Sequence, residues 1–104
     1  MKQNTKIISI DPGYERLGIA VIEKNNPKDI LLFSECFKTS AKLEFTERLG
    51  LLGTRIEEII KKYKPVAFAI EKLYFETNQK TAMYVAQVRG ALMYIALSHG
   101  LVVF

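Results

Sequence analysis

The first third of the chain alternates short apolar runs with turn residues, a pattern typical of short β-strands. Residues 7–10 form a β-branched run that ends at Asp11-Pro12-Gly13, where proline lacks a ladder donor and glycine tolerates positive φ. A short connection leads into the apolar residues 17–22, and so short a link joins only antiparallel neighbours. After a turn at Asn25-Asn26-Pro27, a less regular run spans residues 30–37. The pattern predicts a three-stranded antiparallel meander.

The period of the pattern then changes from strand to helix. Apolar side chains recur three and four residues apart, the spacing of one helix face, at Phe45, Leu49, Leu52, Ile56, Ile59 or Ile60, and Tyr63. Charged residues at 57, 58, 61 and 62 take the opposite face, and Pro65 ends the helix.

Two further strands and one more helix are predicted beyond Pro65. Residues 66–70 form a continuous apolar run, as expected of a strand that is covered on both faces. A loop over residues 73–77 leads to Asn78 as the helix N-cap, and residues 82–98 predict a helix that Gly100 closes. Residues 101–104 predict a last strand.

This order of elements predicts an α/β fold. Three antiparallel strands precede two strands that follow helical crossovers, so we expect a mixed five-stranded sheet, three strands antiparallel and two parallel, with helices packed on it. Residues 1–104 contain no internal repeat or linker, which indicates a single domain. Because the chain stops on an apolar strand with nothing to cover it, we expect a C-terminally truncated domain.

Composition adds weaker constraints. The chain has 15 Lys and Arg against 11 Asp and Glu, a net charge of +4 that permits a nucleic-acid partner without arguing strongly for one. Its single cysteine, Cys36, forms neither an internal disulfide nor a cysteine metal cluster, which fits a reducing interior. No apolar run approaches the roughly 20 residues that span a bilayer, and no export signal opens the chain. The expected location is cytoplasmic.

Two carboxylates interrupt otherwise apolar sequence at strand ends. Asp11 follows the first strand and Glu71 the fourth; parallel neighbours about 4.8 Å apart would bring both to one rim of the sheet. Two anions there need a proton or a cation, and Mg²⁺, with Mn²⁺ as an alternative, is held by such oxygen ligands. Divalent ions held there would activate water and stabilise a leaving oxygen, which is the chemistry of phosphodiester hydrolysis. The alternative is that Asp11 is only a turn former and Glu71 only a solvated residue.

Several sequence blocks resemble the RuvC-type Holliday junction resolvases, in that family's order and spacing. The blocks are Ile8-Ser9-Ile10-Asp11-Pro12-Gly13, Leu17-Gly18-Ile19-Ala20-Val21, Ala69-Ile70-Glu71-Lys72-Leu73-Tyr74-Phe75, Asn78 and Gln87-Val88-Arg89-Gly90. The resemblance implies a ribonuclease-H-like fold and a homodimer that resolves four-way DNA junctions by symmetric Mg²⁺-dependent nicks. By motif position, Asp11 and Glu71 would be catalytic metal ligands. Branch-migration proteins would be candidate partners.

The chain also departs from the family. Two further metal-site residues and the basic DNA-binding residues of the family lie downstream of the last strand, and this sequence ends at Phe104 before any of them. A site with half its ligands binds metal weakly and positions water poorly. We therefore predict that the 104-residue chain does not cleave junctions by itself.

The residues around Glu71 are candidates for DNA contact. Tyr74 is the better candidate for stacking on an opened base, whereas Phe75 is expected to pack inward. Phosphate or DNA contacts are expected from Lys72, Asn78, Lys80 and Arg89. The alternatives are that the aromatic rings pack onto the core and that the cations are ordinary solvated surface.

The second helix, over residues 78–98, is apolar on more sides than one sheet face can bury. A twofold homodimer would cover the remainder and suit a symmetric substrate, although a helix of the absent segment would do the same. Two other classes stay open. One is a non-catalytic DNA-binding or dimerisation module, and the other is a nucleotide-binding domain related to actin-like ATPases, which share the opening strand, Asp-x-Gly turn and hairpin.

Overall fold

A computed structural model of the chain describes residues 5–13, 15–25, 27–70 and 79–104. The elements are β1 (Lys6–Pro12), β2 (Arg16–Glu23), β3 (Ile30–Lys38), α1 (Phe45–Tyr63), β4 (Ala67–Ile70), α2 (Gln79–Ser98) and β5 (Val102–Val103). The strands form one sheet in the order β3-β2-β1-β4-β5, antiparallel from β3 to β1 and parallel from β1 to β5. This arrangement confirms the predicted mixed α/β sheet.

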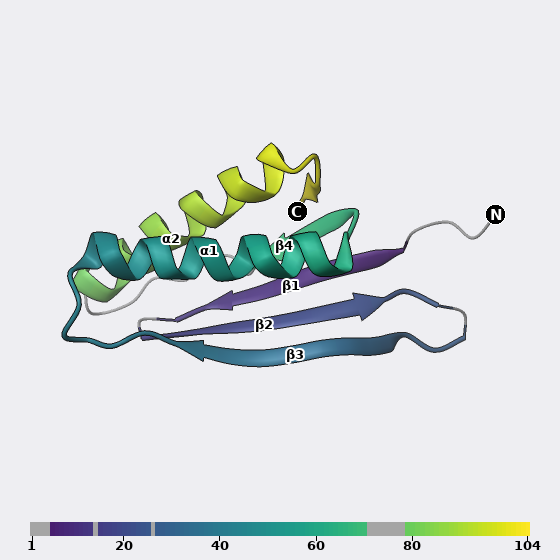
Figure 1. The fold of residues 1–104 in the computed structure, drawn as a ribbon, viewed down its shortest axis with the longest axis horizontal. Coiled ribbons are helices and arrows are strands. Elements are labelled where there is room, and N and C mark those ends of the chain that lie inside the picture. Colours follow the sequence, from purple (N-terminus) through teal and green to yellow (C-terminus); the bar gives the residue numbers. More distant parts are fainter. Residues whose placement is uncertain (1–4, 14, 26, 71–78) are drawn as a thin grey trace.

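Both helices lie on the same side of the sheet, and the core lies between them and the strands (Figure 1). Alternate residues of β1 and β2 point into this core, because side chains alternate between the two faces of a strand. The core-facing positions are Ile8 and Ile10 on β1, Leu17, Ile19 and Val21 on β2, and Phe68 on β4. From the helices, Leu52 and Ile56 of α1 and Val88 and Leu92 of α2 complete it.

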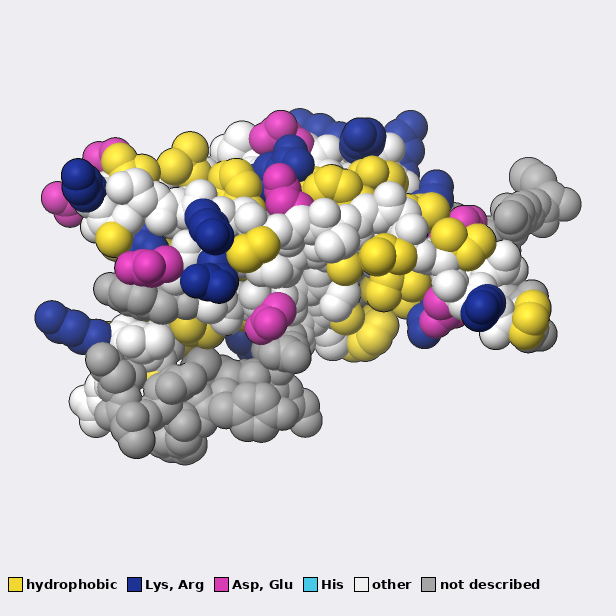
Figure 2. All heavy atoms as spheres, turned by 90° about the horizontal axis from the view of Figure 1, so that it is seen from below, with side chains coloured by type: hydrophobic (Ala, Val, Ile, Leu, Met, Phe, Trp, Pro, Cys, Tyr) yellow, Lys and Arg dark blue, Asp and Glu magenta, His cyan; other side chains and the backbone are white. Residues whose placement is uncertain are grey.

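The opposite face of the sheet carries smaller side chains toward the end of β1. Ser9 of β1 lies opposite Ala20 of β2, and Gly18 of β2 lies opposite both Asp11 of β1 and Cys36 of β3. Figure 2 views the molecule from below, where white atoms of backbone and polar side chains occupy the middle of the surface. Neither α1 nor α2 covers this face (Figure 1).

The ends of α1 follow the sequence prediction. Lys64 caps the helix in the left-handed conformation, with φ 52° and ψ 55°, and its N–H donates to the carbonyl of Ile60 over 2.8 Å. Because the residue before a proline disfavours the helical region, Pro65 stops α1 at this point. Within the described part of the chain, no helix is long and apolar enough to span a membrane.

The predicted boundaries of the last two elements need adjustment. Helix α2 begins at Gln79, directly after the predicted cap position, whereas the apolar pattern marks the helix only from residue 82 because its first residues are polar. The predicted cap at Asn78 lies outside the described residues. Strand β5 is shorter than predicted, but Phe104 continues the pairing: its N–H donates to Phe68 over 3.0 Å, and its carbonyl accepts from Ile70 over 3.1 Å.

Candidate metal and nucleic-acid site

Asp11 lies on β1 one residue before the strand ends, and its side chain is exposed. Its partner across the β1/β2 pair is Gly18, and a Cβ built on Gly18 would lie 3.4 Å from the Cβ of Asp11. The glycine therefore leaves room above the sheet for the carboxylate. Since Leu17 and Ile19 beside Gly18 face the core, Gly18 and Asp11 lie on the opposite face, away from the helices.

The pairing of β1 with β4 bears on the second predicted carboxylate. The two strands are parallel neighbours, as the sequence predicted, and their register places Ser9 opposite Ala69 and Ile10 opposite Ile70. Asp11 follows directly on the last of these pairs. Glu71, the next residue after Ile70, lies outside the described residues, so its closeness to Asp11 stays a prediction.

The turn after Asp11 is held by the backbone. The N–H of Gly13 donates to the carbonyl of Arg16 over 2.9 Å. A Cβ on Gly13 would lie only 3.0 Å from that carbonyl oxygen, so the turn requires a residue without a side chain. Within the described residues, the Asp11 carboxylate takes no part in closing the turn. The carboxylate is therefore available for another role.

The predicted DNA-contacting residues fall into two groups. Lys72, Tyr74, Phe75 and Asn78 lie outside the described residues. Lys80 is exposed in the first turn of α2, and Arg89 is half-buried nine residues later. Nine residues make about two and a half helical turns, so the two cations leave α2 on opposite sides. The helix does not bring them to one face.

A buried arginine that sequence reasoning passed over supports the start of α2. Arg48 is only 5% exposed; its Nε donates to Thr39 Oγ1 over 3.1 Å, and its guanidinium lies 4.8 Å from the ring centroid of Tyr84. Phe45 packs edge-on against the same tyrosine at 5.0 Å. The cluster links the β3–α1 connection to α2. Its sequence signal was a charged residue within the apolar stripe of α1, between Phe45 and Leu49.

A second arginine ties the edge strand β3 to α1. Arg55 donates to both carboxylate oxygens of Glu35, over 2.7 Å and 3.2 Å, and its guanidinium lies 5.8 Å from the ring centroid of Phe33. The hydrogen bond to Glu35 raises the pKa of Arg55 above its ordinary value. This two-point contact fixes the spacing between the helix and the sheet edge.

Sheet order, helix placement and a carboxylate at the end of the first strand define a ribonuclease-H-like domain. Residues 7–104 match the family model described as crossover junction endodeoxyribonuclease RuvC, and the chain belongs to the RuvC family.

Curated relatives agree with this assignment. The RuvC of Brachyspira hyodysenteriae is 42% identical over 86 residues, which are 83% of this chain and 54% of the relative. The RuvC of Halothermothrix orenii is 40% identical over 87 residues, 84% of this chain and 53% of the relative. The chain thus spans about half the length of the curated relatives it matches.

Solved structures give the same family. RuvC of T. thermophilus, determined in complex with a Holliday junction substrate, superposes with a TM-score of 0.87 at 30% identity, covering 96% of this chain and 62% of that one. A Thermus thermophilus RuvC structure superposes with a TM-score of 0.82 at 31% identity. The match covers 95% of this chain and 61% of that one. A PPX-GPPA enzyme of Aquifex aeolicus superposes with a TM-score of 0.53 at 16% identity, which shows a shared fold alone. That match covers 97% of this chain and 35% of the enzyme. Because the chain matches the RuvC family model and its relatives, the alternative of a nucleotide-binding domain is not favoured.

Proposed function

We propose that this chain is part of a structure-selective endonuclease that resolves four-way DNA junctions by paired symmetric nicks. The observation that carries the proposal is the exposed Asp11 carboxylate, which stands above Gly18 at the end of β1, the strand that pairs in parallel with β4. Membership of the RuvC family and likeness to a RuvC structure with bound Holliday junction support the same function.

The proposed metal ligands are Asp11 and Glu71, and the proposed ion is Mg²⁺, with Mn²⁺ as the alternative. The donor set fits, because an exposed carboxylate whose neighbour across the strand pair is a glycine suits a hard cation that keeps several waters. When bound, the ion would activate water and stabilise the leaving oxygen of a phosphodiester. The described residues hold no group of three metal-ligating side chains.

Around this site we propose that residues of the 71–80 segment hold the DNA. Tyr74 would stack on a base that is unpaired at the crossover, while Phe75 packs inward. Lys72, Asn78 and Lys80 would contact the backbone, and the exposed position of Lys80 on the first turn of α2 supports its part. Arg89 leaves the other side of α2 and would need a separate stretch of DNA.

We also propose a homodimer through α2. Met83, Tyr94 and Leu97 are 62%, 71% and 58% exposed, and they recur on one side of the helix. Gly90 lies on the same side with nothing within 4 Å of its Cβ position, so a second backbone could approach closely there. A twofold dimer would present two metal sites to a symmetric junction. Branch-migration proteins remain candidate partners.

The test is to titrate a fluorescent four-way junction, a matched duplex and ATP into the purified chain. We expect the junction to bind more tightly than the duplex, ATP not to bind, and no nicking with Mg²⁺. Nicking that Asp11→Asn abolishes would contradict the expected inactivity but support the nuclease. Binding of ATP without binding of DNA would contradict the proposed function. Since the substrate is DNA, we propose a cytoplasmic location.

A further inference from the structure

Two cations lie directly opposite each other where β2 begins and β3 ends. Arg16 of β2 is the register partner of Lys38 of β3, and both side chains are exposed. The next pair along the same face is Gly18 with Cys36, and Gly18 is also the partner of Asp11. Arg16, Lys38 and Asp11 therefore share one face and one end of the sheet.

The pairing of two cations has an energetic cost. Like charges directly opposite on an antiparallel pair repel and destabilise it. Within the described part of the chain, no carboxylate forms an ion pair with Arg16 or Lys38, although Asp11 and Glu15 lie nearby in the sequence. Among the described residues, therefore, no carboxylate neutralises this positive pair by direct contact.

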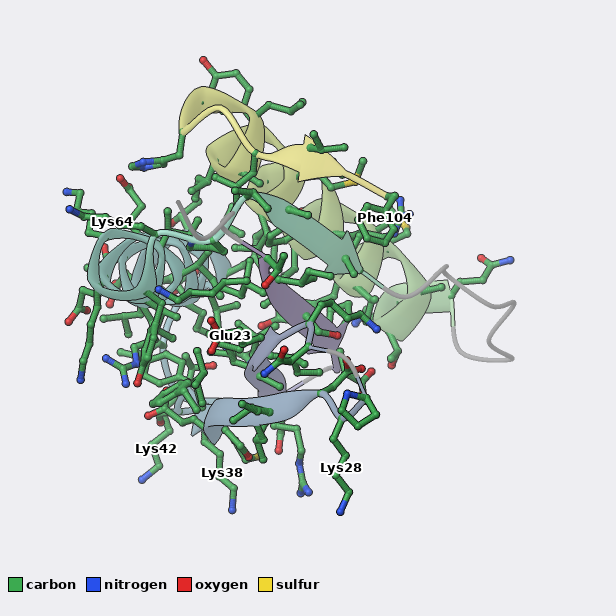
Figure 3. The ribbon with its side chains drawn as sticks, turned by 90° about the vertical axis from the view of Figure 1, so that its right-hand side faces the viewer. Glu23, Lys28, Lys38, Lys42, Lys64 and Phe104 are labelled. Carbon is green, nitrogen blue, oxygen red and sulfur yellow. The ribbon has the colours of Figure 1, made fainter. Side chains whose placement is uncertain are left out.

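This pair adjoins the turn that carries Asp11. A Cβ built on Gly13 would lie 3.5 Å from Cγ of Arg16, so the stem of the arginine lies against the Asp11-Pro12-Gly13 turn. Figure 2 shows Lys and Arg side chains, with Asp and Glu side chains between them, at the left-hand end of the molecule, the end where β1 finishes in Figure 1. Lys38 extends away from the helices (Figure 3).

We propose that Arg16 and Lys38 form a phosphate clamp that holds the DNA backbone beside the metal site. The proposal rests on the proposed function and deepens it by naming a surface of β2 and β3 that meets the substrate. Phosphodiester oxygens would relieve the repulsion between the two cations. They would accept hydrogen bonds from the guanidinium of Arg16 and at the same time neutralise the ammonium of Lys38. We expect the clamp to bind without sequence preference, since phosphate contacts position the DNA but do not distinguish one base sequence from another.

The experiment compares the wild-type chain with Arg16→Gln/Lys38→Gln and with the charge-matched control Lys28→Gln/Lys61→Gln. Both control lysines are exposed; Lys28 precedes β3 at the end opposite Lys38, and Lys61 lies in the last turn of α1. Anisotropy of a labelled four-way junction, measured in EDTA over a salt series, gives the affinity and the salt slope. Thermal unfolding without DNA gives the stability.

We expect the clamp variant to lose roughly tenfold or more in affinity and to lower the salt slope by about two. Its unfolding midpoint should stay level or rise, because the repulsion is removed. The control should lose about twofold or less, since distant exposed charges are screened. Equal losses in the two variants, or a lower midpoint with unchanged affinity, would overturn the clamp and leave the proposed function standing. A wild-type chain that binds no DNA would overturn both.

Discussion

Asp11 depends on a neighbour that has no side chain. Its carboxylate stands above Gly18, whose Cβ position lies 3.4 Å from the Cβ of Asp11. A Cβ at position 18 would touch the Cβ of Asp11, and a branched side chain there would add further atoms that crowd the carboxylate. Glycine in a strand interior is otherwise unfavourable, which indicates that close approach is the reason for its presence.

Gly18→Val should therefore weaken metal binding without unfolding the chain. We expect Mn²⁺ affinity, measured by titration calorimetry, to fall roughly tenfold, a cost of about 1.4 kcal/mol, and Asp11→Asn to abolish binding. The unfolding midpoint should not fall much, because valine favours strands. The matched control is Ala20→Val, one pair further along the same face. Equal affinity in Gly18→Val and the control would refute the spacing argument.

At the residue level, the sequence predicted the position of Asp11 at a strand end but not the pairing of Arg16 with Lys38. Asp11 interrupts an apolar run at a turn, so its type and position mark it directly. The sequence placed the start of the second strand at Leu17 and left Arg16 in the turn, whereas β2 begins at Arg16 and β3 extends to Lys38. A pairing of end residues depends on register, and register is invisible until both strand ends are known.

At the scale of elements, α1 was predicted in full because its apolar stripe and Pro65 both mark it. Arg48 was missed for the same reason: the stripe was counted by its apolar members, although a buried guanidinium also fits beneath Tyr84. Periodicity identifies a buried face but not which polar groups share it. For α2, the apolar pattern marks the helix only from residue 82, because the first turn carries too little apolar surface to leave a pattern.

Arg48→Met should destabilise the fold more than the similar change at Arg55. Arg48 is 5% exposed, and its loss removes a charged hydrogen bond to Thr39 and a cation–π contact with Tyr84. We expect the free energy of unfolding, measured with urea, to fall by about 2 kcal/mol. Arg55→Met breaks a partly exposed ion pair and should cost about 0.5 to 1 kcal/mol. Equal costs would show that burial of Arg48 adds nothing.

At the scale of the whole molecule, one side of α2 has more apolar surface than this chain covers. The exposed stripe of Met83, Tyr94 and Leu97 runs along the helix on the side opposite the buried Val85, Val88 and Leu92. Large exposed apolar residues gathered on one helix face are typical of an interface. The groove beside Tyr94, about 450 Å³ and lined by Gly50 and Gly53 of α1, extends this surface toward the other helix.

Tyr94→Glu should convert a dimer of this chain into a monomer. A charge at the centre of an apolar twofold interface is desolvated twice, once for each copy, because the same residue recurs across the axis. Sedimentation velocity over a concentration series measures the change. The matched control is Leu51→Glu, which places the same charge on a 45% exposed apolar position of α1 and should leave the dimer intact. A wild-type chain that sediments as a monomer throughout would refute the proposed interface, and dissociation by Leu51→Glu alone would move it to α1.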